Sequence, residues 1–168
     1  MLRSLLLTAP GRAFFSFLCG EQGKKIDEAV FRVAGFSLIV HAAAVMNDMS
    51  PLPTLILHTT GRKSGQERSA VMPYIAANDR IYLIGSNGGK PNDPAWVWNL
   101  RERPEARIIV NRRKKNVRAR ILDPTSPERK EVWETQAARS AYHVFQESTE
   151  RPIPIVALED STGSILRP

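Results

Sequence analysis

A short loop flanked by glycines brings cationic side chains and a hydroxyl close together. Its sequence is Thr60-Gly61-Arg62-Lys63-Ser64-Gly65, and Arg68 follows. Glycine permits backbone angles that other residues resist, so the loop can present charged side chains together with free amide groups. Arginine suits two-pronged contacts with a carboxylate or phosphate, and lysine acts as a point charge. The loop therefore indicates an anion site, with a flexible hairpin of solvated cations as the alternative.

A second glycine-rich segment, Ser86-Asn87-Gly88-Gly89, also follows an apolar run. Successive N–H groups in such a segment can form a concave nest for an anion. Trp96 and Trp98 come soon after it, where tryptophans are more often core anchors than ligand platforms. Neither segment has the Walker pattern, and the sequence contains no Gly-x-Gly-x-x-Gly fingerprint. The two loops could therefore converge on one anionic ligand without a standard nucleotide motif.

The sequence offers no pairing of a nucleophile with a base. Ser64, Ser69 and Ser86 have no histidine at an informative spacing, and Cys19 is the only cysteine. The three histidines lie far apart, so we expect no metal site. If the protein is an enzyme, a bound organic cofactor must carry out the chemistry while the protein orients that cofactor.

The chain has 168 residues, 42% hydrophobic and 24% charged, which is typical of a globular domain. Its net charge of +7 favours an anionic ligand, an anionic membrane surface or nucleic acid, and simple solubility is the alternative. A second basic group, Arg112-Arg113-Lys114-Lys115 with Arg118 and Arg120, is expected at a hairpin turn. Because no aromatic residues alternate with these cations, we expect no nucleic-acid partner.

The first fifty residues are expected to be helical, with Asp27 and Glu28 near the start of a helix that ends before Asn47. The apolar stretch Val33 to Met46 is interrupted by His41 and is shorter than the roughly 20 residues that span a bilayer. Phenylalanines at 14, 15 and 17, beside basic residues, can lie on an anionic membrane or pack on the domain. We expect a cytoplasmic protein, either with or without peripheral contact with the inner face of the membrane.

The remaining residues, 51–168, are expected to form a small antiparallel barrel of the α+β class. Asp93 suits the N-cap and Pro94 the first position of a short helix that ends at Arg103-Pro104. Thr125-Ser126-Pro127-Glu128 resembles a capping box that begins one long helix through Trp133, Ala137, Ala141 and Phe145. The expected strands are Thr54–Thr59, Ser69–Ala77, Ile81–Gly85, Ala106–Val110, Val117–Leu122 and Ile153–Leu158, with a turn at Asn78-Asp79-Arg80.

In combination, the two loops, Pro94, Trp96, the segment Asn99–Pro104 and Pro152–Val156 resemble the deazaflavin-dependent nitroreductase and quinone reductase family. The resemblance covers about residues 55–158. It implies a split β-barrel of the FMN-binding type that binds coenzyme F420, a deazaflavin with a phosphodiester and a polyglutamate tail. The cationic loop suits such a tail. The implied cofactor contacts are Arg62, Lys63, Ser64, Arg68, Ser69, Ala70, Ile84, Gly85, Ser86, Asn87, Ala95, Trp96, Val97, Trp98, Asn99 and Tyr142.

The resemblance also implies hydride transfer from the reduced deazaflavin to a quinone, an enone or a nitro-aromatic acceptor. A proton would come from solvent, Tyr142 or the Ser86 hydroxyl, and orientation would supply most of the rate gain. Relatives carry further tyrosines near Tyr142, where this chain has Arg139 and Phe145, and lysine is frequent at the position of Asn87. A split-barrel protein that binds F420, FMN or a lipid-like ligand without turnover is the alternative.

Overall fold

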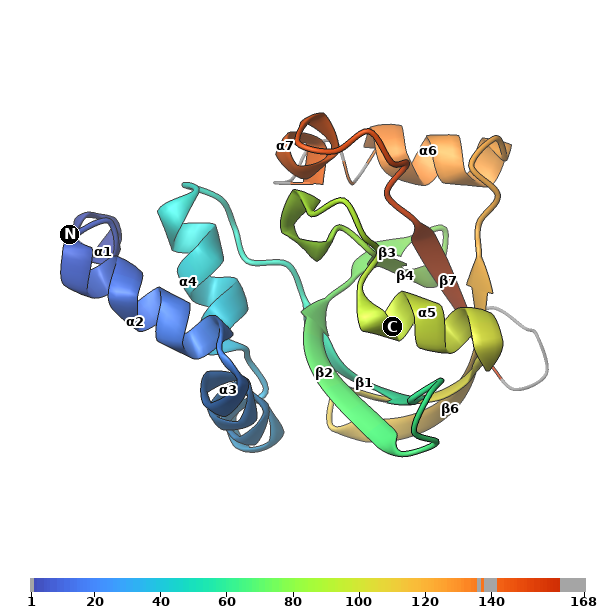
Figure 1. The fold of residues 1–168 in the computed structure, drawn as a ribbon, viewed down its shortest axis with the longest axis horizontal. Helices are drawn as coiled ribbons and strands as arrows, with labels where there is room; N and C mark the ends of the chain where they lie inside the picture. Colours follow the sequence, from blue (N-terminus) through green and yellow to red (C-terminus); the bar gives the residue numbers. More distant parts are fainter. Residues whose placement is uncertain (1, 136, 138–141, 161–168) are drawn as a thin grey trace.

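In the computed structural model, which describes residues 2–135, 137 and 142–160, seven strands form one antiparallel sheet (Figure 1). The order of the strands in the sheet is β2-β1-β5-β6-β7-β4-β3. Their bounds are β1 Thr54–Thr60, β2 Glu67–Pro73, β3 Ile75–Ala77, β4 Arg80–Ile84, β5 Glu105–Val110, β6 Arg113–Ile121 and β7 Ile155–Asp160. The last of the described strands, β7, lies between β6 and β4 and so joins the two halves of the sheet.

The two edge strands are consecutive in the chain, and this forces the sheet to curl. Only Tyr74 separates the end of β2 from the start of β3, although these strands are at opposite ends of the sheet order. The backbone N–H of Tyr74 donates to the carbonyl of Pro53, 2.9 Å away. The single strand expected over 69–77 is therefore two strands. The curled sheet agrees with the predicted α+β split barrel.

Alternation along β1 explains how the sheet is buried on both faces. Leu55 and Leu57 pack in the barrel interior together with Leu100 from α5 (Ala95–Glu102). Ile56, between them, faces the other way and packs with Phe31 and Ile109. Because β1 is buried on both faces, Leu55, Ile56 and Leu57 are consecutive apolar residues, and even His58 and Thr59 of this strand are buried.

Four helices precede the sheet: α1 Leu2–Leu6, α2 Ala9–Cys19, α3 Glu21–Ala34 and α4 Leu38–Met46. They lie to one side of the barrel, on the left in Figure 1. The predicted helix start at Asp27 is wrong, since Asp27 lies in the middle of α3. Its carboxylate accepts hydrogen bonds from the Ser37 hydroxyl and the Ile39 N–H, so it stabilises the start of α4 instead.

Between α3 and α4 the chain turns sharply at Gly35, whose φ is +80°. Within the described residues, no single helix has the length and hydropathy to cross a bilayer. The pair α3 and α4 meets that criterion only when both helices are counted across a bend of 102°. The break at Gly35, more than His41, therefore divides the apolar stretch that ends at Met46.

Helix α3 attaches the N-terminal helices to the outer face of the barrel. Phe31 packs against the sheet, and the Ser69 hydroxyl of β2 donates to the Glu28 carboxylate at 2.6 Å. Glu28 also pairs with Arg32 one turn along the helix. The expected domain division near residue 50 falls in the segment between α4 and β1.

Two further helices, α6 (Pro127–Thr135) and α7 (Tyr142–Glu147), pack over β4 and β7. They replace the single long helix predicted from residue 125, and Ala141 lies outside the described residues. Ser126 caps α6 by accepting the Arg129 N–H. Glu128 does not complete a capping box, because its carboxylate binds Arg80, Tyr82 and Arg120.

Two-residue turns join β3 to β4 and β5 to β6. Both central residues of each turn have positive φ, Asn78 and Asp79 in the first and Asn111 and Arg112 in the second. Such turns match the twist of a hairpin. Arg80 and Arg113 therefore begin strands, and most of the basic group expected in a turn lies along β6.

Candidate cofactor site

The cationic loop between β1 and β2 is a closed turn held by its own backbone. The N–H of Gly61 donates to the carbonyl of Gln66 at 2.8 Å, and the N–H of Gly65 donates to the carbonyl of Gly61 at 2.7 Å. Gly65 has a φ of +67°, where a side chain would be strained. The Ser64 hydroxyl accepts the Gln66 N–H. The sequence pattern thus gives an ordered loop that leaves its charged side chains exposed.

Within the part of the chain that the structure describes, the charges of this loop have no acidic partner. Eight other arginines among the described residues pair with carboxylates: Arg3, Arg32, Arg80, Arg101, Arg107, Arg118, Arg120 and Arg151. By contrast, Arg62, Lys63 and Arg68 are exposed and form no ion pair with any described residue. This residual positive charge fits a ligand with several negative groups, such as the phosphodiester and polyglutamate tail of F420.

The second loop has the backbone conformation of an anion nest. Ser86 is in the right-handed helical region, and φ of Asn87, Gly88 and Gly89 is +50°, +62° and +74°. A right-handed residue followed by a left-handed one turns successive N–H groups toward one side. Asn87 donates its side-chain amide to the carbonyl of Asn92 at 2.9 Å, which fixes the loop. The loop therefore suits the phosphate contact predicted for Ser86 and Asn87.

Asn99 of α5 fastens the cationic loop to the helix. Its carboxamide oxygen accepts the N–H of Arg62 at 3.0 Å, and its nitrogen donates to the Thr59 hydroxyl at 3.0 Å. Asn99 is only 6% exposed. The residue was predicted to line the cofactor groove, and in the structure its polar atoms are engaged in holding the loop.

Trp98, from the same helix, lies beside two arginines. The guanidinium of Arg101 is 4.4 Å from the ring centroid and that of Arg62 is 5.6 Å away. Trp98 is 41% exposed, whereas Trp96 is partly buried against the barrel core. The Trp98 ring therefore lies between a cation of the first loop and a cation of α5.

The other predicted contacts divide into exposed and supporting residues. Ala95 is exposed at the start of α5, while Val97 and Ile84 are buried. A Cβ atom at Gly85 would lie 2.8 Å from Pro154 and 3.0 Å from Val97, so glycine allows this close approach. Ala70 packs on the barrel core, and the Ser69 hydroxyl is bound to Glu28 on the outer face. Of these residues, only Ala95 and Ser69 are exposed, and the Ser69 hydroxyl is already bound to Glu28.

Tyr142 and Ser86 were predicted to supply a proton. Tyr142 is 7% exposed and packs edge-to-face with Phe145 beneath the second loop. Burial raises the pKa of its phenol, so the hydroxyl stays protonated near neutral pH. Ser86 is 9% exposed and lies at the start of the nest. Their catalytic roles stay predictions.

Sequence reasoning missed Arg151 and assigned Asp93 the wrong role. Asp93 was predicted to cap α5, but the N-cap residue is Pro94 and Asp93 pairs with Arg101 and Arg151. Arg151 also donates to backbone carbonyls of the second loop. These partners lie 58 to 66 positions away, so no local pattern could reveal them.

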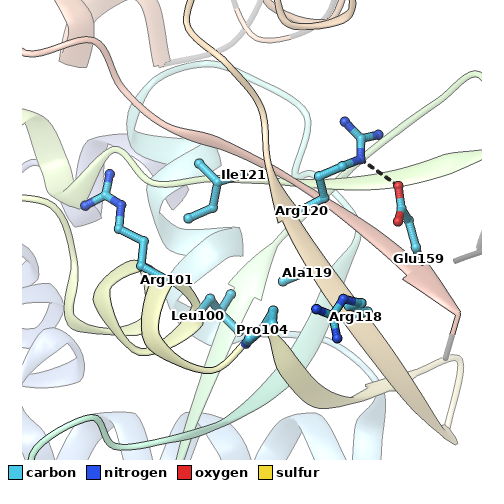
Figure 2. Close-up of a pocket in the computed structure, with 8 residues that line it drawn as sticks. All are labelled: Leu100, Arg101, Pro104, Arg118, Ala119, Arg120, Ile121 and Glu159. Carbon is cyan, nitrogen blue, oxygen red and sulfur yellow. Dashed lines mark hydrogen bonds and ion pairs between the residues drawn. The ribbon is translucent and has the colours of Figure 1, made fainter.

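A separate cavity of about 430 Å³ lies beside the end of α5 and β6 (Figure 2). It contains none of the predicted cofactor residues. Arg118 pairs with Glu105, and Arg120 pairs with Glu128 and Glu159. The cavity therefore lacks the residual charge of the first loop.

A curled seven-stranded sheet with an unneutralised cationic loop beside an anion nest defines a split-barrel oxidoreductase of the deazaflavin type. The family model for F420H(2)-dependent quinone reductase matches residues 39–160, so the chain belongs to this family. The predictions of a split barrel, of an F420-dependent reductase and of F420 as cofactor are confirmed.

Individual relatives agree with this membership. The chain is 35% identical over 108 residues to an F420H(2)-dependent quinone reductase of Mycobacterium tuberculosis. The matched segment covers 63% of this chain and 72% of the relative. It is 28% identical to a solved F420-H2 dependent reductase, with a TM-score of 0.56 over 64% of this chain and 94% of that one. A domain-swapped dimer is 26% identical, with a TM-score of 0.55 over 70% of this chain and 89% of that one.

Proposed function

We propose that the protein reduces a quinone with hydride from reduced coenzyme F420. The observation that carries this proposal is the group of three exposed loop cations without acidic partners, Arg62, Lys63 and Arg68, which is linked through α5 to the anion nest. When bound, the coenzyme supplies a hydride, and the reaction needs no nucleophile from the protein.

The protein contributes position, charge and exclusion of water. The loop cations would bind the negatively charged tail, and the nest at 86–88 would accept the phosphate. Asn99 holds the first loop against α5, and Trp96 of this helix would line the cofactor groove. Tyr142 or Ser86 would hold a proton for the reduced acceptor. Accurate placement of the two reactants can then supply most of the acceleration.

Two measurements test this function. Purified protein is titrated with F420 and, separately, with FMN while cofactor fluorescence is followed. Reduced F420 is then mixed with menadione, an enone or a nitro-aromatic, and its oxidation is recorded. We expect F420 to bind and menadione to be reduced fastest. Preferential binding of FMN, or binding of F420 without oxidation by any acceptor, would contradict the proposal.

We further propose that the N-terminal helices rest on an anionic membrane, where lipid-soluble quinones reside. Seven large apolar side chains of this segment are at least 38% exposed: Leu5, Leu7, Phe14, Phe17, Ile26, Val33 and Phe36. Arg3, Arg12, Lys24 and Lys25 lie in the same helices. An apolar face with flanking cations is typical of a helix bound at a bilayer surface.

Vesicle sedimentation tests the membrane contact. We expect the protein to bind vesicles that contain an anionic phospholipid more strongly than neutral vesicles, and salt to weaken this binding. The double substitution Phe14→Ser and Phe17→Ser should abolish it. Val144→Ser, on the exposed face of α7, is the matched control. Equal sedimentation of the protein with and without vesicles would contradict the contact.

A further inference from the structure

Arg151, in the segment before β7, is a nearly buried arginine that forms hydrogen bonds with the backbone of the second loop. Its guanidinium donates to the carbonyl of Ser86 at 2.7 Å, to that of Gly85 at 3.2 Å and to that of Lys90 at 2.9 Å. It also pairs with Asp93 at 2.7 Å. The side chains of Arg151 and Asp93 are 14% and 11% exposed. One side chain thus joins both ends of the segment that contains the anion nest.

The same ion pair continues to the cationic loop. Asp93 accepts a second arginine, Arg101 of α5, at 2.7 Å. Arg101 lies 4.4 Å from the Trp98 ring, which Arg62 of the first loop also approaches. A continuous row of charged and aromatic contacts therefore runs from Arg151 to the first loop. Such a row fixes the spacing between the two groups that would hold one ligand.

We propose that Arg151, with Asp93 as its counter-ion, is a positioning residue that fixes the nest for the cofactor phosphate. This inference rests on the proposed cofactor contact of the two loops. The nest needs N–H groups aimed at one point, and Arg151 binds the carbonyls of the same peptide units from the opposite side. Its positive charge behind the loop also favours an anion in front of it.

Only arginine can make this set of contacts. A guanidinium presents five N–H donors in a planar fork, whereas an ammonium presents three donors on one atom. In the structure, Nε, Nη1 and Nη2 of Arg151 have different partners. Arg151→Lys keeps the positive charge but cannot reach all of these partners. The variant therefore distinguishes an effect of the charge from an effect of the hydrogen bonds.

The test compares Arg151→Lys with a matched control, Arg129→Lys. Arg129 is also partly buried and donates to a carbonyl of the segment before β7, but its partner is Ile153 and not a residue of the second loop. We expect Arg151→Lys to weaken F420 binding about tenfold to 100-fold, as misplacement of a binding group does, with a smaller change in kcat. Arg129→Lys should bind F420 like the wild type.

Amide hydrogen exchange gives a readout without cofactor. The N–H groups of Gly89 and Lys90 are bonded within the loop, to the carbonyls of Ser86 and Asn87. They should exchange faster in Arg151→Lys, whereas the Gly61 and Gly65 amides of the first loop should not. In Arg151→Ala, guanidinium at concentrations well below those that unfold proteins should restore F420 binding, and methylammonium should not.

The outcomes separate this inference from the proposed function. Failure of the wild type to bind F420 contradicts the function itself. Normal F420 binding by Arg151→Lys, or unchanged exchange at Gly89 and Lys90, overturns the inference alone. If both single variants unfold, the double variant Arg151→Met with Asp93→Asn removes the charges together. That variant must bind F420 more weakly than the wild type, and equal affinity would overturn the inference.

Discussion

The carboxamide of Asn99 accepts the backbone N–H of Arg62 across 3.0 Å and thereby ties α5 to the cationic loop. The two residues are 37 positions apart in the sequence. Asn99 therefore acts on the loop backbone, while the side chain of Arg62 stays exposed toward solvent and Trp98. This arrangement separates the residue that holds the loop from the residues that would contact a ligand.

Removing the Asn99 carboxamide should loosen the loop and destabilise the protein. Asn99→Ala leaves the Arg62 N–H and the Thr59 hydroxyl without this partner, at a cost of about 1–3 kcal/mol in the free energy of unfolding. We expect weaker F420 binding as well. Thr59→Val is the control, because it removes only the bond to Thr59 and keeps the one to Arg62. Denaturant unfolding and F420 titration should show stability loss in both variants but a large affinity loss only in Asn99→Ala.

The loop cations should contribute to affinity through charge. Lys63→Ala and Arg68→Ala should each weaken F420 binding by about tenfold, since each removes about 1.4 kcal/mol of charge-assisted contact. Higher salt should weaken the wild type more than either variant. Lys130→Ala on α6, whose ammonium is near Glu134, is the control. If the wild type and all three variants bind F420 with equal affinity, the first loop is not part of the cofactor site.

Gly88 and Gly89 should differ in their tolerance of alanine. Both have positive φ, but a Cβ at Gly88 meets nothing within 4 Å, while one at Gly89 would lie 2.9 Å from the Ser148 Cβ. Gly88→Ala should cost about 1 kcal/mol from backbone strain alone. Gly89→Ala should cost about 1–3 kcal/mol more because of the clash. Thermal unfolding measures the difference, and equal melting temperatures would show that the loop is not packed on α7.

Stability at low pH should report the docking of α3. Burial alone raises the pKa of Glu28, but hydrogen bonds from Ser69 and Arg32 outweigh it, so the pKa lies below its ordinary value of 4.5. A carboxylate with a lowered folded pKa stabilises the fold above that ordinary value, and its contribution disappears as pH falls through the folded pKa.

Glu28→Gln should therefore melt below the wild type at neutral pH. A loss of about 1 kcal/mol corresponds to about 2–4 °C in a protein of this size. The difference should shrink as the pH falls below 4.5, the ordinary pKa of a glutamate. Glu134→Gln, on the exposed face of α6, should show no such trend. A constant difference at every pH would show that the Glu28 charge does not hold α3.

A proton-donor role of Tyr142 is tested with Tyr142→Phe. If the phenol donates the proton, kcat should fall about 100-fold or more while F420 affinity is unchanged. Because burial raises the pKa of Tyr142 above 10.0, the wild type should also lose stability as pH rises above that value. The variant should lose less, since only Tyr74 and Tyr82 keep such a raised pKa. A kcat within twofold of the wild type would leave Ser86 or solvent as the donor.

The parts of the fold that depend on local sequence could be predicted. Asn78-Asp79 marks a hairpin because Asn and Asp tolerate positive φ, and the observed turn has it. The glycine loops were recognisable for the same reason. The strand break at Tyr74 was not predicted, since the apolar run continues through it and the break follows from closure of the barrel.

Residues whose partners are distant in the chain could not be assigned correctly. Asp93 precedes a proline and a helix, and this position favours an N-cap role. In the structure, however, its carboxylate forms ion pairs with Arg101 and Arg151. Asp27 looks like a residue at a helix start, but it supports the next helix through Ser37. In each case an ion pair or a buried hydrogen bond overrides the local preference.

The position of β7 has a consequence for folding. Because this strand pairs with both β6 and β4, the hydrogen bonds that join the two halves of the sheet cannot form until β7 is in place. Arg151 lies only four residues before β7 and donates to the second loop, so the same short segment closes the sheet and holds that loop. Without β7, the paired edges of β6 and β4 would both be exposed.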